Sequence, residues 1–190
     1  MTANEVAAPK DRVLDDLIAH LSEHGLGNTS LRGLAAGVGT SHRMLSYHFG
    51  SRHNLLIEVS QRVELRQREA FIALVADSEA PVSELMWAMY RRLADPALRS
   101  HERLFFELYV QALQDGEEGQ RYLPDVVEAW IPPLATLFTR MGLDDQHAMV
   151  EARLALAVAR GLLLDLLATE DTAAVDAAMR RYVSRYVPAT

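Results

Sequence analysis

Polar and basic side chains are concentrated between residues 40 and 52, and their types suit contact with nucleic acid. Hydroxyl groups and Tyr side chains bind phosphate oxygens, whereas an Arg such as Arg43 can hydrogen-bond the major-groove edge of guanine through two N–H groups. His42 can also reach a base edge. This pattern predicts a DNA-contact surface formed by Thr29, Thr40, Ser41, His42, Arg43, Ser46, Tyr47, His48 and Arg52.

A second set of residues, His20-x-x-Glu23-His24, has the spacing of an inverted zinc-protease motif. Two His residues four positions apart lie on one face of a helix and can bind zinc, while the Glu acts as a base. No third ligand is evident in the sequence, and ordinary histidines near a helix end give the same pattern. We therefore predict no metal, no cofactor and no enzyme activity, and keep a small metal-dependent hydrolase as an alternative.

The segment around the candidate DNA contacts has the pattern of two short helices joined by a tight turn. Thr29 or Ser30 can cap the first of these helices, and Ser41 can cap the second. Gly39 between them suits a left-handed turn conformation that a Cβ atom would strain. Leu45 and Phe49 are predicted to face inward. This arrangement is typical of a helix-turn-helix that presents one helix to the major groove.

The distribution of charge agrees with this assignment better than the total charge does. The formal net charge of the chain is −7, which is unusual for a DNA-binding protein. Residues 1–70 contain eight basic and eight acidic side chains, and no Asp or Glu occurs between His24 and Ile57. The acidic excess therefore lies in the remainder of the chain, which is expected to face away from phosphates.

Length and composition indicate an ordinary globular protein. The chain has 190 residues, of which 49% are hydrophobic and 24% charged. The absence of cysteine excludes disulfides and thiolate metal sites. The N-terminus lacks the apolar region of a secretion signal, and no run approaches the length of a membrane span. We expect a cytoplasmic protein without a membrane segment.

Apolar residues recur with helical spacing along almost the whole chain, which predicts an all-α protein of about nine helices. We expect an N-terminal three-helix DNA-binding domain over residues 1–55. A larger helical domain for ligand binding and dimerisation is expected over residues 56–190, joined to the first by the fourth helix.

Methionine and aromatic residues in the second domain could form a pocket for a small apolar or amphipathic ligand, because methionines adapt to varied shapes and aromatics bury large areas. Simple core packing is the alternative for each residue. The candidates are Met86, Met89, Tyr90, Phe105, Phe106, Tyr109, Trp130 and Phe138. Polar residues also occur within the apolar stretches: Glu102, Arg103, Glu107 and Asp165. Any of them could anchor the polar group of a ligand, but each is expected to be exposed at the surface.

The last two predicted helices have a small-residue face and a regular apolar stripe, respectively. Little chain remains to cover the stripe, and a helix-turn-helix protein that binds two half-sites requires symmetry. We therefore predict a homodimer interface. Its candidate residues are Ala155, Ala159, Leu162, Val175, Met179, Tyr182, Val183 and Tyr186.

The chain resembles the tetracycline-repressor (TetR) family of bacterial transcription regulators. Residues 29–35 are similar to the second helix of that family, and Gly39-Thr40-Ser41 to its turn. Tyr47-His48-Phe49-Gly50-Ser51-Arg52 followed by Leu55-Leu56 resembles its aromatic-His-Phe-x-Ser-Lys motif. Two positions differ: Ser46 stands where the family often has an aromatic residue, and Arg52 replaces the usual lysine.

This resemblance implies a transcriptional regulator, most often a repressor, that binds a palindromic operator in double-stranded DNA as a dimer and responds to a small ligand. The individual residues at 42–44 mean that the operator sequence does not carry over. A helical interaction module without DNA contact remains a further alternative to the hydrolase.

Overall fold

The computed structural model describes residues 9–26, 30–76, 78–114 and 116–187, with the side chains of residues 9 and 117–122 left out of the description. These residues form helices and no strands, so the predicted all-α class is confirmed. Ten α-helices and two short 3₁₀ turns are present in this part of the chain, compared with the predicted nine helices.

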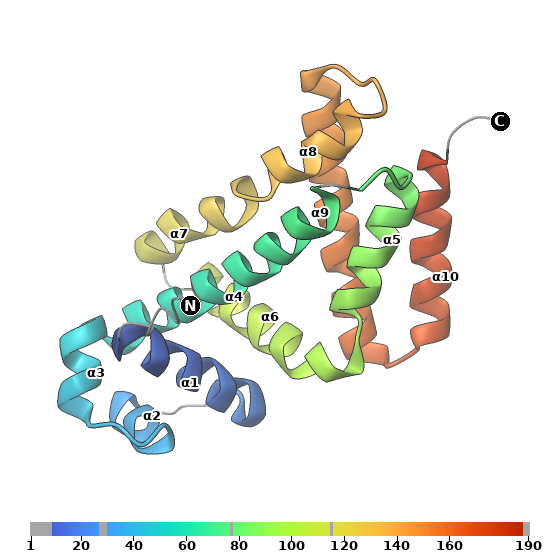
Figure 1. Cartoon of the computed structure of the whole chain (residues 1–190). Coiled ribbons are helices and arrows are strands. Elements are labelled where there is room, and N and C mark those ends of the chain that lie inside the picture. The colour runs from blue at the N-terminus through green and yellow to red at the C-terminus, as the bar shows by residue number, and fades with distance from the viewer. Residues whose placement is uncertain (1–8, 27–29, 77, 115, 188–190) are drawn as a thin grey trace, which may run out of the picture.

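The first three helices form a small unit at one end of the molecule (Figure 1). They are α1 (Pro9–His24), α2 (Leu31–Gly37) and α3 (His42–Phe49). Each boundary has a local cause: Ser30 Oγ accepts a hydrogen bond from the Gly33 amide, and Ser41 Oγ accepts one from the Met44 amide. Gly39 has φ +65°, the left-handed conformation predicted for the turn.

The long helix α4 (Arg52–Val75) leaves this unit and runs into the larger half of the molecule. Ser51 caps it by accepting a hydrogen bond from the Asn54 amide. Because α4 is continuous, it connects the two halves rigidly. The predicted domain boundary at residue 55 lies within this helix and stays a prediction. Leu55, Leu56, Val59 and Val63 of α4 belong to the hydrophobic cluster of the first unit.

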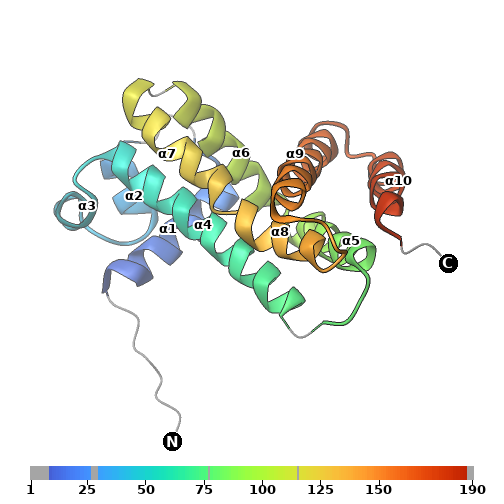
Figure 2. The same cartoon turned by 90° about the horizontal axis from the view of Figure 1, so that it is seen from above.

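The larger half contains the remaining helices. They are α5 (Val82–Leu93), η1 (Pro96–Leu98), α6 (Arg99–Gln114), α7 (Gly116–Glu128), α8 (Ile131–Thr139), α9 (Asp145–Thr169), α10 (Thr172–Val183) and η2 (Ser184–Tyr186). Helix α9 packs against α8, α6 and α10, and α10 also packs against α5. Viewed from above, α9 lies between α10 and the layer of α4, α6 and α7 (Figure 2).

Two hydrophobic clusters correspond to the two halves, but α6 contributes to both. Leu104 and Leu108 of α6 belong to the cluster formed by α1–α4. Phe106 of the same helix packs against the cluster of the larger half. Helix α6 therefore contacts the N-terminal unit on one side and the interior of the second half on the other.

Candidate nucleic-acid interface and ligand cavity

Helix α3 has a buried side and an exposed side, as expected for a helix that is held by its own domain and presented to a partner. Leu45 is fully buried and Phe49 is 3% exposed, so the inward orientation predicted for both is confirmed. Tyr47 is 81% exposed, and His42, Arg43 and Met44 are also exposed. The exposed side therefore carries the base-reading candidates.

The other candidate DNA contacts lie around this face with different exposure. Ser41 is exposed, while Thr40, Ser46 and Arg52 are half-buried. His48 is half-buried and lies between the rings of Tyr47 and Phe49, at 5.2 and 6.1 Å. Thr29 lies outside the described residues. DNA contact by any of these side chains stays a prediction.

The His20-x-x-Glu23-His24 motif lies at the C-terminal end of α1. The two imidazole rings stack at 4.3 Å between centroids, and His24 Nδ1 lies 2.9 Å from the His20 carbonyl oxygen. Within the described residues, no three His, Cys, Asp or Glu side chains are placed to hold a metal ion together. The geometry thus gives no support to the hydrolase alternative.

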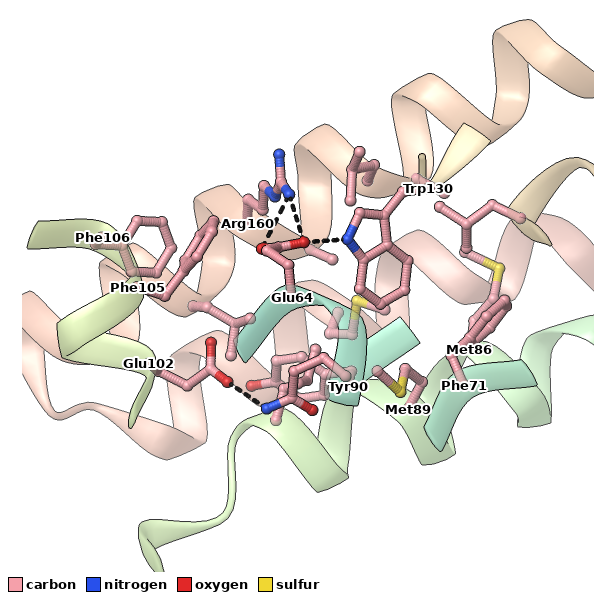
Figure 3. Close-up of a pocket in the computed structure, with 18 of the residues that line it drawn as sticks. Glu64, Phe71, Met86, Met89, Tyr90, Glu102, Phe105, Phe106, Trp130 and Arg160 are labelled. Atoms are coloured by element: carbon pink, nitrogen blue, oxygen red, sulfur yellow. Dashed lines mark hydrogen bonds and ion pairs between the residues drawn. The ribbon is translucent and has the colours of Figure 1, made fainter. Parts of the chain in front are cut away.

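The larger half encloses a cavity of about 80 Å³ between α4, α5, α6, α8 and α9. Six of the eight predicted pocket residues line it: Met86, Met89, Tyr90, Phe105, Phe106 and Trp130. Figure 3 shows these side chains arranged around the space. Ligand contact by them stays a prediction.

The structure does not place Tyr109 or Phe138 at this cavity. Phe138 is fully buried against the ring of Tyr186, at 5.2 Å, and fills the core elsewhere. Tyr109 packs beside Phe105 at 5.8 Å, in a separate small cluster. Helical spacing alone cannot distinguish the two outcomes, because a side chain that faces inward can meet either a cavity or a filled core.

Helical spacing did not identify Glu64 or Arg160, and for Glu102 it favoured a surface position over a role as anchor of a ligand's polar group. Glu64 and Glu102 are 8% and 7% exposed, so the expected surface position of Glu102 is wrong. Arg160 also lines the cavity, as does the amide of Gln67. A polar residue within an apolar stretch was the only available signal, and it does not show which way a side chain points.

Glu64 is already well neutralised (Figure 3). It accepts a hydrogen bond from Trp130 Nε1, and Arg160 Nη2 lies 3.4 Å from Glu64 Oε1. Arg160 also donates to the Val126 carbonyl oxygen at 3.2 Å and lies over the ring of Phe105, 5.1 Å from its centroid. Burial raises the pKa of Glu64, although the Arg160 charge opposes this shift.

Glu102 has much less compensation. Its Oε1 accepts one hydrogen bond, from Gln67 Nε2 at 3.2 Å. Burial and the negative charge of Glu64 together raise the pKa of Glu102 to about 8, although the charge of Arg160 opposes the shift. The carboxyl group is therefore mostly protonated near neutral pH while the cavity holds no countercharge.

Comparison with known proteins addresses the N-terminal unit first. Residues 13–59 match the family model of bacterial regulatory proteins, tetR family. Residues 13–59 thus carry the pattern of the TetR family. The family resemblance deduced from the helix-turn-helix residues is therefore confirmed.

Solved structures extend the similarity of fold to almost the whole chain. A TetR transcriptional regulator from Legionella pneumophila superimposes with a TM-score of 0.78 at 16% identity, covering 97% of this chain and 100% of that one. A protein from Saccharomonospora viridis in complex with choline gives 0.71 at 21% identity, covering 93% and 94%. The multidrug binding protein EbrR complexed with imidazole also gives 0.71 at 21%, covering 96% and 97%. No curated protein sequence matches the chain.

The larger half of the molecule differs from the sequence-based expectation in the packing of its last helix, α10. The apolar stripe of α10 faces α5 and α9 within the same chain. The five predicted interface residues of this stripe are all buried: Val175, Met179, Tyr182, Val183 and Tyr186. The premise that little chain remains to cover the stripe is wrong, because α5 returns to this side of the molecule.

The three predicted interface residues on α9 are also turned toward the interior. Ala155 and Ala159 line the cavity, and Leu162 packs against the main core. The outward side of α9 carries a different stripe. Its members, all exposed, are Val150, Leu154, Ala157, Gly161 and Leu164.

Proposed function

We propose that this protein is a ligand-responsive transcriptional repressor that binds a palindromic operator as a homodimer. The observation that carries the proposal is the exposed face of α3, where His42, Arg43 and Tyr47 project from a helix anchored by Leu45 and Phe49. Such a helix can enter the major groove while its buried side stays in the domain core. Because its proposed partner is DNA, the protein is also proposed to act in the cytoplasm. Among the described helices, none has the length and hydropathy of a membrane span.

The second copy is proposed to pack on the outward side of α9. Val150, Leu154 and Leu164 are exposed by 63%, 38% and 51%. A Cβ atom added at Gly161 would meet no atom within 4 Å, so a second helix can approach closely there. Pairing through this stripe would give the symmetry needed to place two α3 helices about 34–36 Å apart in successive major grooves.

The cavity supports control by a small molecule. It is lined mostly by apolar side chains with few polar groups, the usual composition of a ligand site. Two proteins of similar fold were solved with choline and with imidazole. A ligand that binds better to a conformation with different α3 spacing would weaken operator binding by thermodynamic linkage.

The purified protein is first used to select an inverted-repeat operator from random DNA. That operator is then titrated with the wild type and with the Arg43→Ala and Arg52→Ala variants. We expect Arg43→Ala to lose about 1–3 kcal/mol on the selected sequence and to accept other bases at one position. Arg52→Ala should weaken binding evenly across sequences and lower the salt dependence by about one unit of slope.

Fluorescence anisotropy at several salt concentrations measures both effects. Ala73→Glu, an exposed position on α4, serves as a control and should bind as the wild type does. Unchanged binding of both Arg variants would reject docking through α3.

A further inference from the structure

The lining of the cavity contains one more acidic group than basic groups. It includes two carboxylates, Glu64 and Glu102, and one cation, Arg160. Arg160 pairs with Glu64, which also accepts the Trp130 N–H, so these two charges cancel. Arg68 adds positive potential at Glu64 and not at Glu102. Glu102 is therefore the carboxyl group without a counter-ion.

An unpartnered hydrogen-bond acceptor lies next to it. Gln67 Nε2 donates to Glu102, but the amide oxygen of Gln67 is buried without a hydrogen-bond partner among the described residues. A buried hydrogen-bond acceptor that is left unpaired is unfavourable. Both Glu102 and the Gln67 oxygen can accept, so a group that donates hydrogen bonds and carries positive charge satisfies both.

The surrounding side chains suit the same kind of ligand. Phe105, Phe106, Trp130 and Tyr90 present aromatic rings around the space, and Met86 and Met89 provide polarisable thioethers (Figure 3). Aromatic faces attract cations, and methionines adapt to apolar bodies of varied shape. The Tyr90 hydroxyl is already used, since it donates to Asp176 at 3.0 Å.

An anionic ligand fits poorly here. The positive charge of Arg160 is committed to Glu64, to the Val126 carbonyl oxygen and to the ring of Phe105. A carboxylate ligand in this space would face two buried acidic side chains, and no positively charged side chain of the lining would be available to pair with it. Desolvation of an unpaired anion beside like charges is strongly unfavourable.

We propose that the cavity binds a small organic cation, a protonated amine with an apolar body, and that Glu102 is its counter-ion. The Gln67 amide oxygen accepts a second hydrogen bond from the ammonium group, and the rings hold the apolar part. This inference deepens the proposed function and rests on it for the regulatory consequence, while binding itself can be measured without DNA.

Binding of the cation is coupled to loss of a proton. In the empty cavity Glu102 has a pKa of about 8, and a bound ammonium stabilises its carboxylate form, which lowers that pKa. Affinity should therefore rise with pH, by up to about tenfold per unit, and level off above about pH 8. The charged groups that face Glu102 from α4 and α9 are Glu64 and Arg160, which pair with each other.

Isothermal titration calorimetry of the purified full chain with benzylamine, benzyl alcohol and benzoate separates charge from shape. We expect benzylamine to bind at least tenfold more tightly than benzyl alcohol at pH 7.5, and benzoate to bind least. Glu102→Gln should remove the preference for benzylamine and leave benzyl alcohol unchanged. Glu84→Gln, an exposed position on α5 outside the lining, is the matched control and should keep the preference.

A second measurement does not depend on the variant folding well. Benzyltrimethylammonium keeps its charge at every pH, so its affinity from pH 6 to 9 reports titration of the protein alone. We expect the affinity to rise and then level off, with release of about one proton per cation at pH 6.5 in buffers of different ionisation enthalpy.

Equal binding of benzylamine and benzyl alcohol by the wild type would overturn the inference, as would a cation preference that survives Glu102→Gln. Operator binding measured in parallel keeps the two proposals apart. A cation preference without operator binding rejects the regulator proposal alone, and operator binding without a cation preference rejects this inference alone.

Discussion

Two glutamates in one cavity differ in their hydrogen-bond and ion-pair partners. Glu64 pairs with Arg160 and accepts a hydrogen bond from the Trp130 N–H, whereas Glu102 has only an amide beside it. Their exposed fractions are nearly equal, so the difference comes from partners and not from burial. The Glu102 carboxyl is consequently the titrating group whose effect on folding can be tested separately from any ligand.

Replacement of Glu102 by Gln should change how stability depends on pH. The folded-state pKa, about 8, lies above the ordinary value of 4.5. The folded chain therefore binds more protons than the unfolded chain between these values, and the wild type loses stability as pH rises from 4.5 to 8. The variant lacks this loss and should be more stable than the wild type by a few kcal/mol at pH 8.5, with the difference shrinking toward pH 5.

Urea unfolding at pH 5, 7 and 8.5, at one fixed protein concentration, measures the difference. Glu84→Gln should follow the wild-type curve, since that side chain is exposed. A stability difference between Glu102→Gln and wild type that does not vary with pH would contradict the assignment.

At the scale of elements, α6 is the connection between the cavity and the DNA-binding unit. Glu102, Phe105 and Phe106 of this helix line the cavity. One turn further on, Glu107 Oε2 accepts a hydrogen bond of 3.0 Å from the Leu26 amide, in the connection between α1 and α2. A movement of α6 on ligand binding would therefore act directly on the domain that carries α3.

Removal of this hydrogen bond should weaken the coupling between ligand and DNA. We expect Glu107→Ala to reduce by about fivefold the ratio of operator Kd values with and without benzylamine, which corresponds to about 1 kcal/mol for one such bond. Benzylamine binding to the free protein should not change, because Glu107 lies outside the cavity lining. Glu107→Gln retains an acceptor and should keep most of the coupling.

Operator anisotropy with and without saturating benzylamine gives the ratio. An unchanged ratio in Glu107→Ala would show that the coupling does not pass through this contact.

At the scale of the whole molecule, function depends on which surface the chain leaves uncovered. The stripe of α10 is covered by α5 and α9, and hydrogen bonds reinforce the packing: the Tyr186 hydroxyl donates to Glu151 of α9 at 2.6 Å. The outward side of α9 stays exposed and apolar. A second copy of the chain is the partner proposed for this side of α9, because the proposed palindromic operator requires two-fold symmetry.

A charge in the α9 stripe should therefore separate the protomers without unfolding them. We expect Leu154→Glu to convert a dimer to a monomer in light scattering and to lower operator affinity at least tenfold. Met179→Glu, on the covered stripe, should instead unfold the chain in circular dichroism, because Met179 is 2% exposed. A Leu154→Glu variant that remains dimeric would place the interface elsewhere.

The amino-acid sequence alone determined the features that arise from local interactions. Helical periodicity, the Ser and Asp caps and the left-handed turn at Gly39 depend on residues only a few positions apart, and so does the orientation of α3 with Leu45 inside. The family assignment also came from such a contiguous segment.

Only the tertiary structure decided which apolar faces meet and which remain free. Glu64 and Glu102 come from two helices 38 positions apart, and the cover over the α10 stripe comes from α5, more than 80 residues earlier in the chain. A period of 3.6 residues shows that a helix has an apolar side, but burial is non-directional and depends on the total area removed from water. The sequence pattern therefore cannot indicate whether that side meets another helix of the same chain, a cavity or a second protomer.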